Sequence, residues 1–200
     1  MFRNVSKGLL LVVGFTYSLP THLQANWHGA TYCKKSTNES RGLTSFMKTY
    51  VLVREQVVNQ SIDKAFEFFG NAYNLEKITP SFLKFRILTQ GLEKIRAGSV
   101  IDYSLSLFFI PFKWQTLIEA WQPGEYFIDR QIKGPYKLWV HKHTFEKVSE
   151  GQTRVRDEVR YEVPFGFLGT IAHVLFVGPS LKRIFDFRAM ATRHALEEES

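Results

Sequence analysis

The chain has 200 residues, of which 44% are hydrophobic and 15% aromatic, and a formal net charge of +7. This length and composition suffice for one domain with a substantial apolar core. The charge does not indicate a nucleic-acid partner, because five Lys/Arg and one Glu in residues 1–46 supply +4, which leaves only +3 for residues 47–200. Cys33 is the only cysteine, so the sequence excludes an intramolecular disulfide and a cysteine-based zinc cluster.

The first 46 residues are expected to lie outside the folded domain, which spans residues 47–200. Residues 1–8 are basic, residues 9–19 are apolar, and Ala25 offers a small residue at a candidate cleavage point. This is the outline of a secretory signal peptide, and the apolar run is too short for a stable membrane span. The other interpretation is a true start at Met47. We expect a cytoplasmic protein, with export as the alternative if residues 1–25 act as a signal peptide.

Strand and helix patterns then follow one another along the chain. Tyr50–Val58 alternates and is rich in Val, which predicts a strand. Ser61 predicts the N-cap of a short helix that ends at Gly70, and a second short helix is predicted over Tyr73–Ile78. Further strands are predicted over Phe85–Thr89, Val100–Phe109, Phe112–Gln122, Glu125–Ile132, Tyr136–Val148 and Thr153–Val163. The last of these strands places Arg154, Arg156 and Arg160 at alternate positions, which we interpret as its solvent-facing side.

A long C-terminal helix completes the pattern. Gly166 and Gly169 are expected to loosen the chain before helical periodicity runs over Thr170–Glu198, and Gly178-Pro179 should kink or split that helix. Grouped strands followed by a helix predict an α+β fold rather than alternating βαβ units. We expect a curved antiparallel sheet wrapped around the long helix, two short helices after the first strand, and a cavity between sheet and long helix. One side of the long helix carries Leu181, Ile184, Phe185 and Arg188.

Large aromatic and ionisable side chains share the predicted inner face of the sheet. Trp139, His141 and His143 lie on one face of one strand, and Asp157 is expected on the same side of the next strand. A face that carries both kinds of side chain is more typical of a cavity than of a dry core. The alternation predicts a ligand site formed by Tyr103, Trp114, Thr116, Trp139, His141, His143, Phe145, Asp157 and Tyr161.

The group formed by His141, His143 and Asp157 has two interpretations. A carboxylate beside an imidazole fixes its tautomer and raises its basicity, as an acid/base pair requires. The same residues suit a buried polar network that fixes strand register, which we prefer because the sequence shows no accompanying nucleophile or oxyanion donors. Asp129 and Gln131 either extend this polar patch or lie near a strand end. The spacing does not predict a metal site, and no cofactor is expected.

Four stretches of the sequence carry a family resemblance. They are NAYNLEKITP (71–80), IDYSL (101–105), PFKWQTLIEAWQPGEYFIDRQIKGPYKLWVHKHTF (111–145) and DEVRYEVPFGFLG (157–169). Together they resemble the START-like, or SRPBCC, ligand-binding superfamily, near its polyketide cyclase and coenzyme Q-binding branches, over about residues 47–195. The resemblance implies a helix-grip fold with a deep apolar cavity. It does not imply one reaction, since the superfamily includes lipid carriers, hormone receptors, cyclases and hydrolases.

Two functions from different classes are compatible with these observations. The first, which we prefer, is a non-catalytic protein that binds or carries a small, mostly apolar ligand such as a lipid, a quinone or a polyketide-like ring. The alternative is a cyclase- or hydrolase-like enzyme that uses His141, His143 and Asp157 as acid/base groups. In both, the expected partner is an apolar small molecule rather than nucleic acid.

Overall fold

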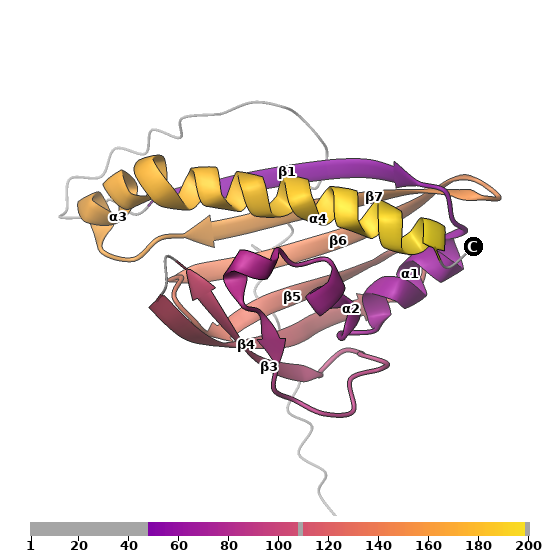
Figure 1. The fold of residues 1–200 in the computed structure, drawn as a ribbon, viewed down its shortest axis with the longest axis horizontal. Helices are drawn as coiled ribbons and strands as arrows, with labels where there is room; N and C mark the ends of the chain where they lie inside the picture. The colour runs from indigo at the N-terminus through magenta and orange to yellow at the C-terminus, as the bar shows by residue number, and fades with distance from the viewer. Residues whose placement is uncertain (1–47, 108–109, 199–200) are drawn as a thin grey trace, which may run out of the picture. The chain divides into compact units, whose positions relative to one another are not determined.

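The structure is a computed structural model that describes residues 48–107 and 110–198. The predictions for residues 1–46, and for a start at Met47, lie outside the described residues. Seven strands of the described part form one antiparallel sheet in the order β1-β7-β6-β5-β4-β3-β2 (Figure 1). Their bounds are β1 Thr49–Val58, β2 Arg86–Ile87, β3 Val100–Leu107, β4 Ile110–Gln122, β5 Tyr126–Lys133, β6 Leu138–Ser149 and β7 Gln152–Glu162.

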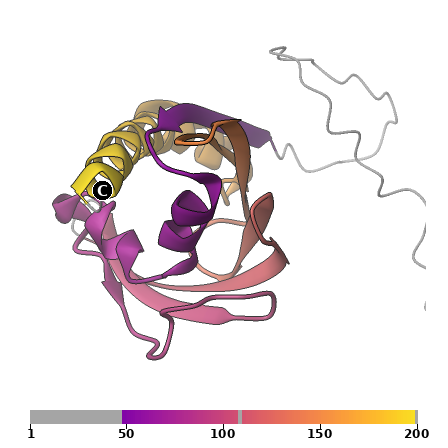
Figure 2. The ribbon, with the colours of Figure 1, turned by 90° about the vertical axis from the view of Figure 1, so that its right-hand side faces the viewer.

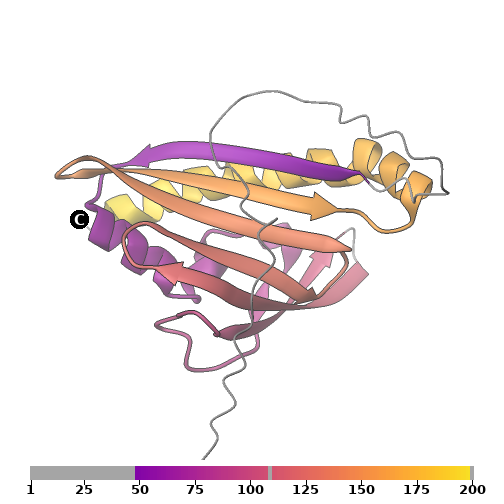
Figure 3. The ribbon, with the colours of Figure 1, turned by 180° about the vertical axis from the view of Figure 1, so that it is seen from behind.

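Two groups of helices accompany the sheet. After β1 come α1 (Ile62–Gly70), α2 (Asn74–Lys77) and the 3-10 turn η1 (Ser81–Leu83). After β7 come α3 (Gly166–Ala172), the π-helical turn η2 (His173–Val177) and α4 (Gly178–Glu198). Figure 2 shows the sheet curving around the interior with α4 on its open side, and Figure 3 shows β1, β7 and β6 side by side from behind. This arrangement confirms the predicted α+β plan of a curved sheet wrapped around a long C-terminal helix.

Helix α1 forms where its capping residue predicts it, and it fills one end of the sheet's inner face. The Ser61 hydroxyl accepts a hydrogen bond from the Lys64 backbone N–H at 3.4 Å, which satisfies a donor left free at the helix start. The apolar side of α1 is buried, and Phe66 lies at its centre. Its ring centroid is 4.8–6.2 Å from those of Trp121, Phe127 and Phe145. This end of the sheet is therefore closely packed around Phe66.

The pairing of three central strands brings together the polar side chains of the inner face. Asp129 of β5 lies opposite His141 of β6, and His143 of β6 lies opposite Asp157 of β7. The inward positions of β7 are buried and alternate with more exposed ones. The predicted inner faces of β6 and β7 are therefore confirmed, and the register adds Asp129 to the group.

The C-terminal helical run starts earlier than predicted. Gly166 and Gly169 belong to α3 instead of loosening the chain, so the prediction of a start at Thr170 is wrong. Gly169 is required at this point, because a Cβ there would lie 2.0 Å from the carbonyl oxygen of Pro164. The predicted interruption is confirmed just before Gly178-Pro179, where η2 widens the helix. Proline lacks the N–H of a regular helix and crowds the carbonyl four residues earlier, which a π turn accommodates.

The outer face of the sheet carries ion pairs. Arg154 lies 3.2 Å from Glu55 and 2.7 Å from Glu146, while Arg156 and Arg160 both contact Glu158. The three arginine side chains are 37–42% exposed, which confirms their solvent-facing interpretation. Among the helices of the described residues, none is both long and apolar enough to cross a membrane.

Candidate functional site

A cavity of about 180 Å³ lies between the inner face of the sheet and the helices that cover it. Strands β3 to β6 supply one side, and α1, α2, η1 and α4 supply the other. Most of the lining side chains are apolar. The polar, aromatic and charged groups that reach it include Tyr103, Trp114, Thr116, Asp129, Trp139, His141, His143 and Arg188.

Two aromatic side chains of the cavity wall, Trp114 and Tyr103, have their polar atoms paired with Thr116. The indole N–H of Trp114 donates to Thr116 Oγ1 at 3.0 Å, and the Tyr103 hydroxyl shares a hydrogen bond with the same oxygen at 3.3 Å. Trp139 packs edge-on against Trp114 with ring centroids 5.3 Å apart. Burial raises the pKa of Tyr103, so this hydroxyl stays protonated. The wall therefore presents apolar ring surface to whatever enters the cavity.

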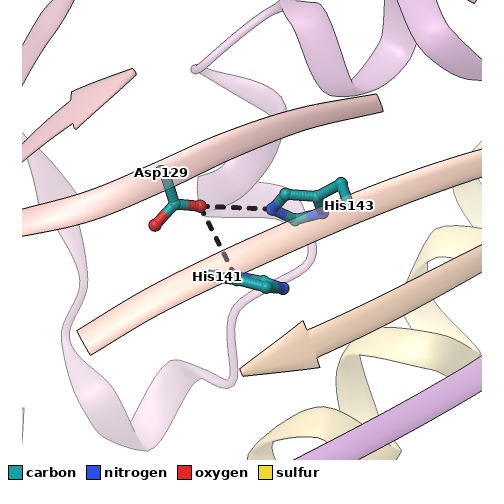
Figure 4. A group of neighbouring side chains, drawn as sticks. All are labelled: Asp129, His141 and His143. Carbon is teal, nitrogen blue, oxygen red and sulfur yellow. Dashed lines mark hydrogen bonds and ion pairs between the residues drawn. The ribbon is translucent and has the colours of Figure 1, made fainter. Parts of the chain in front are cut away.

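Two imidazoles and two carboxylates form a buried polar cluster, of which Figure 4 shows His141, His143 and Asp129. His141 Nε2 lies 2.9 Å from Asp157 Oδ1, and His143 Nε2 lies 3.2 Å from Asp129 Oδ2, both as hydrogen bonds. Two further contacts close the cluster, His141 Nδ1 to Asp129 Oδ2 at 3.4 Å and His143 Nδ1 to Asp157 Oδ1 at 2.8 Å. Neither of these is aligned as a hydrogen bond, and His143 Nδ1 is a buried atom without a hydrogen-bond partner. The rings are less than 5% exposed.

The pKa values of the two imidazoles are shifted in opposite directions, and those of the two carboxyl groups are both lowered. Burial lowers the pKa of His141, and the charge of His143 lowers it further. Burial alone would also lower the pKa of His143, but its hydrogen bond to Asp129 and the adjacent carboxylate of Asp157 outweigh burial and raise it. Burial opposes ionisation of Asp157, yet the two imidazoles hold the pKa of that carboxyl well below its usual range. The pKa of Asp129 is lowered in the same way, against burial, by His141, His143 and Arg188.

Comparisons with known proteins identify the fold. No protein-family model matches the sequence, and no curated protein matches it. Norcoclaurine synthase from Thalictrum flavum, solved with dopamine and hydroxybenzaldehyde, matches with a TM-score of 0.57 at 15% identity over 84% of this chain and 98% of its own. A START superfamily protein from Mycobacterium smegmatis matches with a TM-score of 0.55 at 13% identity over 75% and 99% of the two chains. The domain has the START-like helix-grip fold. An aromatase/cyclase from a Streptomyces species shares it, with a TM-score of 0.55 at 15% identity over 76% and 93% of the chains.

Within the START-like fold, six of the nine predicted ligand-site residues line the cavity. They are Tyr103, Trp114, Thr116, Trp139, His141 and His143. Phe145, Asp157 and Tyr161 also lie on the inner face, but they are not among the residues that line this cavity. Helix α1 covers Phe145, and Asp157 lies against the two imidazoles. Tyr161 packs on Trp139 and bonds to His173 of η2.

Two charged residues, Asp129 and Arg188, also line the cavity. For Asp129 the sequence leaves two interpretations open, an extension of the polar patch or a position near a strand end, and the structure places it in the cavity wall beside the two imidazoles. Arg188 reaches the cavity from α4, and its Nε is buried without a hydrogen-bond acceptor. The signal for Arg188 was its position on the same side of the helix as Leu181 and Phe185. Gln131 is not a lining residue, because its amide holds the backbone of Tyr136 at 2.6 Å and 3.3 Å.

The contact between Tyr161 and His173 predicts a pH dependence of stability. His173 stacks on Tyr50 with ring centroids 3.4 Å apart, and its Nε2 lies 2.8 Å from the Tyr161 hydroxyl. Burial, together with the charge of Lys48, lowers the pKa of His173 below its ordinary 6.5. Because the unfolded chain then binds the proton more readily, this site's stabilising contribution is complete above about pH 6.5 and is lost as pH falls through the lower folded pKa. The melting temperature should therefore fall more steeply between pH 8 and pH 5 for the wild type than for His173→Gln. Parallel curves would contradict the assignment.

Proposed function

We propose that the domain binds a small, mostly apolar ligand in the cavity. The observation that carries the proposal is a lining of apolar and aromatic side chains with a few convergent polar groups, which is the usual composition of a small-molecule site. The volume of about 180 Å³ is close to the roughly 150 Å³ of an apolar cavity that accepts benzene. A ligand with one ring or a short chain therefore fits this volume. A whole lipid or quinone would fit only if its tail extended out of the cavity or if lining side chains moved.

Arg188 supports a further property of this ligand. A buried guanidinium N–H without an acceptor is costly, and a ligand oxygen supplies the missing acceptor. The Arg188 guanidinium also lies within the electrostatic reach of Asp129 and Tyr103, at the polar end of the cavity. The ligand class that suits both the apolar lining and Arg188 is an apolar molecule with one carbonyl or carboxylate group.

The test compares three tryptophans of the same chain. Displacement of an apolar fluorescent dye by aromatic carboxylic acids measures binding, and mass spectrometry of small molecules that copurify with the protein identifies candidates. Trp114→Ala and Trp139→Ala should weaken dye binding at least several-fold. Trp121→Ala, a change at a tryptophan packed in the core beside Phe66, is the matched control and should affect stability more than binding. The proposal is wrong if the wild-type protein binds none of the probes.

A second candidate, a cyclase- or hydrolase-like enzyme, is favoured by one observation. His141, His143 and Asp129 all reach the cavity, so acid/base groups face the space where a substrate carbonyl would lie. Asp157 then acts as a positioning residue that orients both imidazoles. Incubation of the protein with aromatic and polyketide-like carbonyl compounds separates the two functions. Turnover that disappears in His143→Gln while the melting temperature is retained favours the enzyme.

A further inference from the structure

Three donor atoms in the cavity wall converge as metal ligands do. Asp129 Oδ2 lies 3.4 Å from His141 Nδ1 and 3.2 Å from His143 Nε2 (Figure 4), and the three residues each offer a ligand atom within 4.8 Å of those of the other two. Metal–ligand distances of about 2.0–2.2 Å place neighbouring ligands of one ion about 3.0–3.5 Å apart at octahedral or tetrahedral angles. The two separations from Asp129 fall in that range.

The hydrogen-bond pattern of the cluster is incomplete without a cation. When His143 donates from Nε2 to Asp129, its Nδ1 faces Asp157 Oδ1 at 2.8 Å without an aligned hydrogen bond. When His141 donates from Nε2 to Asp157, its Nδ1 lone pair faces Asp129 Oδ2 at 3.4 Å. A second proton on His143 relieves the first of these contacts and leaves the second. Buried lone pairs that face a carboxylate are unfavourable, so the geometry calls for positive charge between them.

A bound cation removes both conflicts once the His143 proton has moved from Nε2 to Nδ1. With the His143 proton on Nδ1, both imidazoles have an N–H beside Asp157 Oδ1, at nitrogen–oxygen distances of 2.9 Å and 2.8 Å, and the first of these is aligned as a hydrogen bond. His141 Nδ1, His143 Nε2 and Asp129 Oδ2 are then left free as donors on the cavity side. An imidazole that binds a metal through one nitrogen and a carboxylate through the other is the usual arrangement in metal sites. The charge also balances, since two carboxylates and two neutral imidazoles carry −2.

We propose that Asp129, His141 and His143 bind one divalent transition-metal ion of the zinc or iron(II) type, with Asp157 as the positioning residue of both imidazoles. Two nitrogen ligands and one carboxylate leave coordination positions open, and these face the apolar cavity. The proposal does not require the apolar ligand, because the metal ligands are side chains of adjacent strands that are already in register.

The test is titration of the chelator-treated full-length protein with Zn²⁺ by calorimetry, and with Co²⁺ by visible absorption. We expect one equivalent to bind in the micromolar range or tighter. Asp129→Asn and His143→Gln should each weaken binding at least 100-fold, and Asp157→Asn should weaken it about 10- to 100-fold, as expected for loss of an outer-sphere carboxylate. Asp186→Asn, a change at an exposed carboxylate, is the matched control. Histidines in residues 1–47 are common to every variant, so differences between variants report this cluster alone.

Substitution of Arg188 distinguishes the metal proposal from the proposed binding of an apolar ligand. Its guanidinium acts on Asp129 from α4 and repels a nearby cation, so Arg188→Gln should bind Zn²⁺ several-fold more tightly. The same change should weaken binding of an aromatic carboxylic acid, because the oxygen acceptor loses its donor. The metal proposal is overturned if the wild type shows no saturable Zn²⁺ or Co²⁺ binding, or if Asp129→Asn and His143→Gln variants that keep the wild-type circular dichroism spectrum bind as tightly as the wild type. Failure of acid binding alone overturns only the ligand proposal.

Discussion

Asp157→Ala is expected to lower the free energy of unfolding of the metal-free protein by about 1–3 kcal/mol, the usual cost of leaving a buried polar group without its partner. The carboxylate is the hydrogen-bond acceptor of His141 at 2.9 Å and lies 2.8 Å from His143 Nδ1. Both rings are buried, so loss of this acceptor leaves an imidazole N–H without its partner. Chemical denaturation of the wild type and the variant measures the difference.

Two further substitutions serve as controls for the loss of stability in Asp157→Ala. Asp157→Asn keeps one acceptor oxygen of similar shape and should therefore cost less than Asp157→Ala. Asp186→Ala removes an exposed partner of Arg54 and Lys182 and should change the free energy of unfolding by less than about 1 kcal/mol. If Asp157→Ala kept wild-type stability and abolished a measured reaction, the structural role would be refuted and the enzyme favoured.

The inner face of β6 could be predicted because the geometry of a strand fixes the face on which each side chain lies. Side chains at alternate positions share a face, so Trp139, His141 and His143 had to lie together once the strand was recognised. The capping hydroxyl of Ser61 and the apolar side of α1 are equally local signals, and both are confirmed. Local rules therefore determined most of the secondary structure and the direction of each site side chain.

Which segments cover each part of a sheet face depends on elements far apart in the chain. Phe145 and His143 point the same way, yet α1 covers Phe145 while His143 borders the cavity. Asp129 joins the cluster only because β5 pairs with β6 in the register that sets it opposite His141. Arg188 reaches the site only through the path of α4. None of these relations has a signature within one short stretch of sequence, because each depends on how elements far apart in the chain pack.

Phe145→Ala separates core from cavity wall and is expected to have the largest effect on stability. Its ring is 4% exposed and lies 5.0 Å from the Phe66 centroid and 5.4 Å from that of Phe69, so truncation leaves a hole that close-packed neighbours fill only in part. We expect a loss of about 3–5 kcal/mol in the free energy of unfolding.

The matched comparison for Phe145 is Trp139→Ala, on the same face of the same strand but in the cavity lining. Trp139 faces a space that is already present, so its removal should cost less stability than removal of Phe145 and should weaken binding of apolar probes more. Denaturation curves and dye binding, both measured below the unfolding transition of each variant, give the two quantities independently. If Phe145→Ala left stability nearly unchanged and abolished dye binding, Phe145 would belong to the cavity wall after all, and the division of this face into a solid end packed by α1 and a hollow end at the aromatic wall would have to be redrawn.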